Sequence, residues 1–119
     1  KKENSSMCAA PSVSPTDLAL AKEFTRRLAE QVDPQLFTVT LFGSRARGDA
    51  DEESDLDLFV VLKEDDPQGK IKEVASHIAC DLTLESGILV AIFVADKEFL
   101  KQHEGFSFLQ AVEEEGVLL

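Results

Sequence analysis

The fold of this chain is decided between residues 36 and 62, which read LFTVTLFGSRARGDADEESDLDLFVVL. Residues 36–42 and 56–62 consist largely of β-branched, aromatic and leucine side chains, so each run predicts a β-strand. The polar segment that begins at Gly43 predicts one or two helical turns, which stop near Gly48 and lead into an acidic loop. This stretch therefore predicts two strands joined by a short helix and a loop.

A long helix is predicted before the first strand, from residue 15 to about residue 32. Ser14 is a suitable cap, Pro15 suits the first helical position, and Asp17 stands where the acid of a capping box reaches back to the cap. Apolar residues recur at helical spacing and are expected to face a core. They are Leu18, Ala21, Phe24, Leu28 and Val32.

After the second strand, the pattern predicts a helix over residues 70–85 that ends at Gly87, followed by a third strand over residues 88–95. Within this helix, Cys80 is expected to be a small core residue. The third strand is apolar on both faces, which predicts a central strand or one covered on both sides. A helix over residues 96–102 and an amphipathic segment over residues 106–115 follow.

Helices alternate with strands, which predicts an α/β (α+β) domain in which helices pack on a small mixed sheet of three or more strands. The length of 119 residues corresponds to one domain. We assign it to residues 14–119 and expect residues 1–13 to form a flexible tail.

The composition excludes several classes of partner. Twelve Lys and Arg residues against 23 Asp and Glu residues give a net charge of −11, which repels the phosphate backbone and makes nucleic acid an unexpected partner. A nucleotide carried by Mg²⁺ is compatible with this charge, because the metal supplies positive charge locally. No apolar run is long enough to cross a bilayer, and the first residues lack the apolar core of a signal peptide, so we expect a cytoplasmic protein without membrane contact.

Asp55 and Asp57 are the candidate metal ligands. Residues two apart in a strand project from the same face, with α-carbons about 6.6 Å apart, so the two carboxylates can converge on one cation. Mg²⁺ accepts one or two carboxylates and completes its coordination with water and substrate phosphates, and one or two such ions can serve a phosphoryl or nucleotidyl transfer. The alternating apolar residues of the same strand are expected to point into the core.

Gly43 and Ser44 are the candidate phosphate-binding residues. They stand where the first strand ends and the short helix begins, so free backbone amides and the Ser44 hydroxyl favour a phosphate, and Gly43 permits close approach. Arg45 and Arg47 follow in the same short helix, where at least one is expected to reach a triphosphate oxygen. If the two strands are neighbours in the sheet, these residues lie beside the aspartates. A plain structural domain would leave this whole combination to chance.

The stretch LFGSRARGDADEESDLDLFVVL resembles the active-site segment of the minimal nucleotidyltransferases of the polymerase-beta-like superfamily, whose pattern is Gly-Ser, ten residues, Asp-x-Asp. The resemblance implies the polymerase-beta-like fold and the transfer of a nucleoside monophosphate, with ATP as the expected donor, to a hydroxyl with release of pyrophosphate and the help of Mg²⁺. It also implies that Gly43 and Ser44 hold the triphosphate, and that Asp55 and Asp57 bind the metal and carry the catalysis.

The same resemblance bears on partners. Many minimal members are encoded beside a helical HEPN protein and act as its antitoxin. We therefore expect the acceptor to be such a protein or a small molecule, and a homodimer is another way to supply the surface that presents the acceptor. Active members usually carry a third carboxylate on a later strand, whereas residues 88–95 contain no acid. Asp96 is expected to cap a helix, and Asp81 and Glu85 to face solvent. The alternative is therefore a non-catalytic, antitoxin-like module that binds nucleotide and acts by contact.

Overall fold

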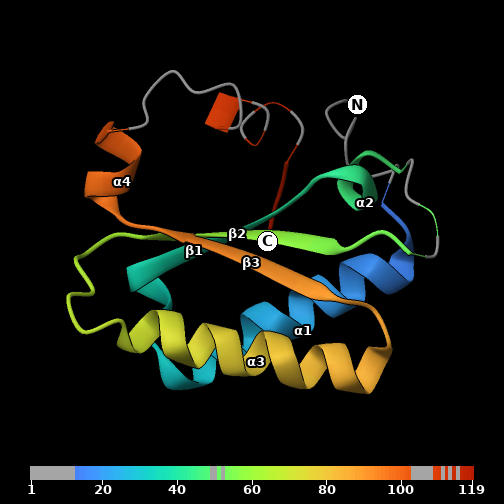
Figure 1. Ribbon diagram of the computed structural model, residues 1–119, viewed down its shortest axis with the longest axis horizontal. Helices are drawn as coiled ribbons and strands as arrows, with labels where there is room; N and C mark the ends of the chain where they lie inside the picture. Colours follow the sequence, from blue (N-terminus) through green and yellow to red (C-terminus); the bar gives the residue numbers. More distant parts are fainter. Residues whose placement is uncertain are drawn as a thin grey trace.

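The computed structural model of the chain describes residues 13–48, 51, 53–102, 109, 110, 112, 114 and 116–119 (Figure 1). The elements in chain order are α1 (Pro15–Gln31), the 3₁₀ turn η2 (Pro34–Leu36), β1 (Phe37–Phe42), α2 (Ser44–Arg47), β2 (Leu56–Leu62), α3 (Lys70–Ser86), β3 (Val90–Ala95), α4 (Lys97–Gln102) and β4 (Val117–Leu118). The predicted order of helices and strands is confirmed, and β4 is an addition to it.

The sheet has the strand order β3-β2-β1-β4. β1 pairs antiparallel with β2 and with β4, whereas β2 pairs parallel with β3. The predicted mixed sheet is thus confirmed, and the two strands on either side of the glycine–serine turn are neighbours. Gly116 fits closely beside β1, because a Cβ there would collide with Thr40 and with the Val112 carbonyl.

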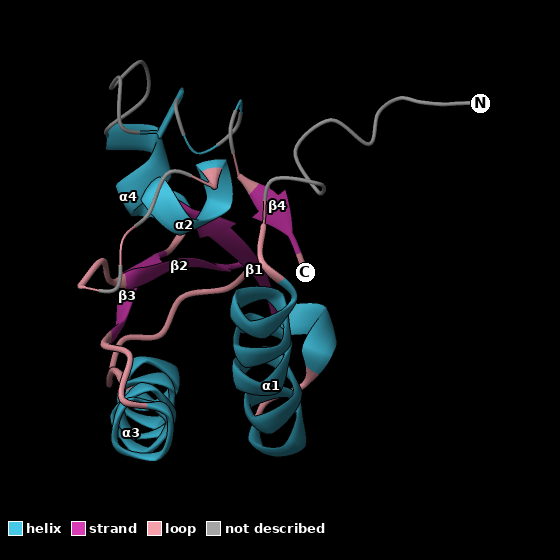
Figure 2. Ribbon diagram, turned by 90° about the vertical axis from the view of Figure 1, so that its right-hand side faces the viewer, coloured by secondary structure: helices cyan, strands magenta, loops and turns pink. Residues whose placement is uncertain are grey.

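The two long helices cover one face of the sheet, and α2 and α4 lie on the opposite side (Figure 2). The main core lies between the sheet and α1 with α3. Alternate residues of β2 point into this core, as predicted, and Leu58 and Val60 are fully buried. Asp57 lies on the other face of the sheet, where Phe59 belongs to a second, smaller hydrophobic cluster.

The start of α1 confirms one prediction and corrects another. The Ser14 hydroxyl accepts from the Asp17 amide at 3.0 Å, so Ser14 is the cap. The Asp17 carboxylate, expected to complete a capping box, instead accepts from Arg45 Nη1 at 2.8 Å, because a guanidinium is a stronger donor than a backbone amide. Val13, which we assigned to the flexible tail, is buried in the core, and residues 1–12 lie outside the described residues.

Local hydrogen bonds define the limits of α3. The Asp66 carboxylate accepts from the amides of Lys70, Ile71 and Lys72, and Gly87 ends the helix in the left-handed conformation that was predicted. Cys80 was predicted to be a core residue and is exposed. The buried face of the helix passes through Ala75, Ile78, Ala79 and Leu82, which leaves Cys80 on the solvent side.

The prediction that the third strand is central or covered on both sides is wrong, because β3 is an edge strand. α3 returns the chain parallel to β2, and the next strand, β4, joins the opposite edge. Val90 is buried, but Phe93 on the other face is 45% exposed and meets the Phe42 ring at 5.6 Å between centroids. The apolar composition therefore reflects packing on α3 and on this aromatic contact.

At the end of the chain, residues 109, 110, 112 and 114 are helical, and the rest of the predicted segment 106–115 lies outside the described residues. Val112 is buried against Phe59 and Ala95. None of the described helices is both long enough and apolar enough to cross a membrane.

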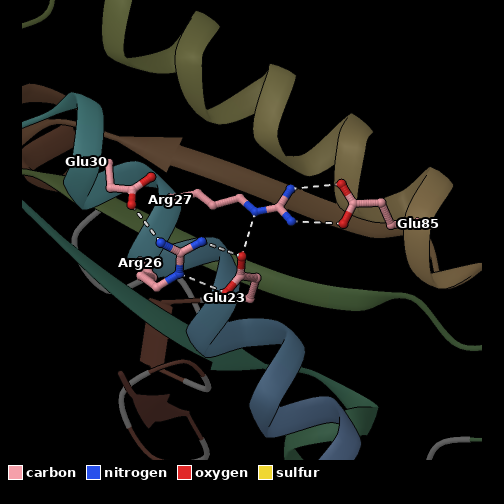
Figure 3. Close-up of polar contacts among 5 residues, drawn as sticks. All are labelled: Glu23, Arg26, Arg27, Glu30 and Glu85. Atoms are coloured by element: carbon pink, nitrogen blue, oxygen red, sulfur yellow. Dashed lines mark hydrogen bonds and ion pairs between the residues drawn. The ribbon is translucent and has the colours of Figure 1, made fainter.

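An ion-pair network ties α1 to α3 on the protein surface (Figure 3). Arg27 donates two hydrogen bonds to Glu85, at 3.0 and 2.9 Å, and a third to Glu23 at 2.7 Å. Arg26 bridges Glu23 and Glu30. Donation from Arg26 and then Arg27 lowers the pKa of Glu23 to about 2, and donation from Arg27 lowers the pKa of Glu85.

Replacing Glu85 with Gln removes the link between the two helices and should lower the melting temperature slightly at low salt. Because the folded-state pKa of Glu85 lies below 4.5, its contribution is present above that pH and is lost as pH falls through the lowered value. Thermal unfolding at low and high salt measures the effect, with exposed Glu64→Gln as the control. A difference that persists at high salt would contradict an exposed ion pair.

Candidate functional site

The turn between β1 and α2 depends on glycine. Gly43 has φ 82° and ψ −163°, a backbone region that is essentially restricted to glycine, and its carbonyl accepts from the amides of Ala46 and Arg47 at 3.1 Å. α2 then runs for four residues and stops at Gly48, as predicted, and Gly48 has a left-handed conformation. The chain therefore turns sharply and presents the Ser44 backbone and hydroxyl just beyond the end of β1.

This turn packs directly against Asp57. The register of β1 and β2 places Phe42 opposite Asp57. A Cβ added to Gly43 would stand 3.3 Å from the Asp57 Cγ and would overlap its Oδ2. The structure thus brings together Gly43, Ser44 and Asp57, the two halves of the sequence pattern, which are more than ten residues apart along the chain.

The carboxylates of Asp55 and Asp57 bring two negative charges close together. Asp55 is exposed just before β2, whereas Asp57 is half-buried within it. Burial raises the pKa of Asp57, the negative charge of Asp55 raises it further, and the positive charge of Arg47 lowers it. The two carboxylates therefore lie close enough to repel each other, and Arg47 is near them.

The donor set of this pair suits a hard cation. Carboxylate oxygens are the ligands that Mg²⁺ prefers, and the electrostatic cost of keeping two of them together falls when a cation binds. Asp55 and Asp57 would be the ligands. Within the described part of the chain, no group of three or more His, Cys, Asp or Glu residues is placed to hold a metal.

The two arginines of α2 differ in their surroundings. Arg47 is exposed. Arg45 is 8% exposed, and its guanidinium donates to Asp17, to the Ser54 carbonyl at 2.9 Å, and to the Asp51 carbonyl at 3.4 Å. We expected at least one of them at the triphosphate, and the structure places the Arg45 guanidinium among protein groups. The sequence does not reveal this, because the partners are 6 to 28 residues away.

No carboxylate of β3 faces the aspartate pair. Ala91 is the neighbour of Asp57 in the parallel register, and Phe93 follows on the same face. Asp96 accepts from the Phe99 amide at 2.9 Å and so caps α4, as predicted. Asp81 and Glu85 are exposed on α3, which confirms their predicted orientation toward solvent. Among the described residues, β3 therefore contributes no third acid to the folded site.

A separate concavity of about 350 Å³ opens at the other end of β2, beside the start of α3. Its carboxylates include Asp66 and Asp96, which already accept from the amides of α3 and α4. These groups stabilise helix ends, so this concavity does not share the chemistry of the aspartate pair.

Comparison with known proteins identifies the class of this protein. Residues 21–116 match the family model described as "Nucleotidyltransferase domain", so the chain belongs to that family. Two proteins of Methanocaldococcus jannaschii named "Putative protein adenylyltransferase" are similar over nearly their whole length. One is 36% identical over 100 residues, which cover 84% of this chain and 95% of the relative. The other is 32% identical over 98 residues, which cover 82% and 92%.

A solved structure from Sulfolobus solfataricus, titled as a "putative nucleotidyltransferase", is 30% identical, with a TM-score of 0.48. The match covers 87% of this chain and 78% of the other. The family match and the two relatives confirm the resemblance found in the glycine–serine and aspartate pattern, and with it an enzyme of the nucleotidyltransferase type.

Replacing Gly43 with Ala should destabilise the fold. The backbone conformation alone costs about 1–3 kcal/mol for a non-glycine residue, and the new methyl group would displace the Asp57 carboxylate. Gly69→Ala is the control, because Gly69 also has a positive φ but open space around its Cβ position. Urea unfolding should show a larger loss for Gly43→Ala. Equal losses would show that the contact with Asp57 is unimportant.

Replacing Asp57 with Asn should stabilise the metal-free protein at neutral pH. The raised folded-state pKa means that ionised Asp57 costs stability above that pKa, and the cost disappears as pH falls below the ordinary value of 3.8. The gain in melting temperature with EDTA should therefore vanish in acid. Exposed Asp81→Asn is the control, and a lower melting temperature for Asp57→Asn at neutral pH would be the contrary result.

Proposed function

We propose that this protein transfers a nucleoside monophosphate, AMP from ATP, to a hydroxyl group of a partner protein. The observation that carries this proposal is the packing of the Gly43 backbone against the Asp57 carboxylate, which unites a phosphate-binding turn with a metal-binding pair. Membership of the nucleotidyltransferase family supports the reaction type. The names of the two M. jannaschii relatives support AMP as the transferred group and a protein as the acceptor.

Each residue has a defined role in this proposal. Gly43 and Ser44 would bind the phosphates of the donor through backbone amides and the Ser44 hydroxyl, with Arg47 supplying positive charge. Asp55 and Asp57 would hold one or two Mg²⁺ ions. When bound, Mg²⁺ neutralises the negative charge of the phosphates and favours departure of pyrophosphate. The raised pKa of Asp57 keeps its carboxylate basic, which favours a metal at neutral pH.

The proposed reaction consumes only ATP and the acceptor hydroxyl. The acceptor oxygen forms a bond to the α-phosphorus. The bond between the α-phosphorus and the oxygen that joins it to the β-phosphorus breaks, and pyrophosphate leaves. Among the described residues, β3 presents Ala91 and Phe93 beside Asp57 and no general base, so this proposal passes the hydroxyl proton to solvent or to a group of the acceptor. We therefore expect an acceptor that brings its own activating surroundings, which suits a protein better than a simple alcohol.

The alternative is a non-catalytic module that binds nucleotide and acts by contact with a helical, HEPN-like partner, as an antitoxin would. The missing third carboxylate favours this alternative. The close pair of Asp55 and Asp57 argues for catalysis, since two carboxylates with no cation between them are unfavourable. A homodimer would be another way to complete an acceptor surface, and the net charge of −11 argues against nucleic acid in either case.

Incubation with labelled ATP, Mg²⁺ and the product of the neighbouring gene should label that product. Replacing both Asp55 and Asp57 with Asn should reduce labelling at least about 100-fold, because loss of metal-based charge stabilisation costs several kcal/mol in the transition state. Exposed Asp81→Asn is the matched control and should label as the wild type does. A wild-type complex that forms normally but carries no label would favour the contact module instead.

A further inference from the structure

The Arg45 side chain joins three parts of the chain that are separate in sequence. Its guanidinium contacts Asp17 in the first turn of α1 and two carbonyls, those of Asp51 and Ser54, in the loop before β2. Both members of the ion pair are 9% exposed at their side chains, so the pair is buried. Arg45 itself belongs to α2 and directly follows Ser44.

These contacts hold the backbone immediately before Asp55 in the chain. The Ser54 carbonyl that accepts from Arg45 Nε is part of the peptide group joining Ser54 to Asp55. The next peptide group is held as well, because the Leu56 amide donates to the Leu89 carbonyl at 2.8 Å. Asp55 thus lies between two peptide groups that are both hydrogen-bonded to distant parts of the chain.

A buried ion pair is a poor means of increasing stability, because desolvation of the two charges offsets most of their attraction. Two apolar side chains of similar size would fill the same space and stabilise the fold without the desolvation cost. What an apolar pair cannot do is donate to carbonyls, and the planar guanidinium donates in several fixed directions at once. The arrangement is therefore better suited to fixing geometry than to increasing the stability of the fold.

We propose that Arg45, with Asp17 as its charge partner, is a positioning residue that fixes Asp55 relative to Ser44 and so sets the distance between the metal-binding and phosphate-binding halves of the site. This proposal rests on the proposed function for the meaning of that distance. It replaces the expected role of Arg45 as a nucleotide ligand.

The test replaces the ion pair with an apolar pair, Asp17→Val with Arg45→Met, in the full chain. The first measurement needs no ligand: amide hydrogen exchange by NMR. The protected amides of Ser54 and Leu56 should exchange about tenfold faster in the variant, as expected for the loss of one hydrogen bond of ordinary strength, whereas amides of α3 should be unchanged. Unchanged exchange at Ser54 and Leu56 in the folded variant would overturn the proposal.

The second measurement is the affinity of the protein for Mn²⁺ together with ATP, determined by calorimetry. Loss of a group that orients a metal ligand typically weakens binding about 10–100-fold, and we expect this range for the apolar pair at an unfolding midpoint close to that of the wild type. A purely structural ion pair would instead change the midpoint and leave the affinity unchanged. Arg47→Met is the matched control on α2, and it should weaken ATP binding without altering exchange at Leu56.

A more conservative variant keeps the proposal testable if the apolar pair does not fold. Arg45→Lys retains a positive charge opposite Asp17 but loses the fork that reaches the Ser54 and Asp51 carbonyls. It should show faster exchange at Ser54 and weaker Mn²⁺–ATP binding, and wild-type values in both would refute a positioning role. If wild-type protein binds no Mn²⁺–ATP, the proposed function fails, and the exchange measurement still decides whether Arg45 fixes Asp55.

Discussion

The antiparallel pairing of β1 with β2 determines both the core and the site. Its register places Leu41 opposite Leu58, which point into the core on one face, and Phe42 opposite Asp57 on the other. A shift by one residue would exchange the faces, exposing the leucines and burying the carboxylate. The hydrophobic effect that holds the leucines inside therefore also holds Asp57 beside the Gly43 turn.

The site itself is assembled from groups that are unfavourable in isolation. Gly43 adopts a conformation that other residues avoid, Asp57 is half-buried near a second negative charge, and Arg45 is a buried cation. Each requires a partner from a different element of the fold. The partner of Arg45 is Asp17 of α1. A local excess of electrostatic cost at one end of two inner strands of a well-packed sheet is typical of a functional site.

Much of the fold could be predicted because its signals are local. Ser14 and Asp17 mark the start of α1, Gly87 ends α3, and the apolar spacing of both helices identifies the faces that are buried. Two of the mistakes have a common cause. Cys80 and the strand β3 were assigned from apolar composition alone, which does not say which neighbour, if any, covers a given face. β4 is only two residues long and carries too little pattern to predict.

The sequence by itself determined the elements, the glycine–serine turn and the two aspartates, because residue type and spacing control backbone conformation and side-chain direction over a few residues. Only the tertiary structure decided that Gly43 touches Asp57, that β3 is an edge strand whose Ala91 offers no third acid, and that Arg45 is turned toward Asp17 and the Ser54 carbonyl. The physical reason is that these relations join residues far apart in the chain. Their geometry follows from sheet register and helix packing, which no short stretch of sequence encodes.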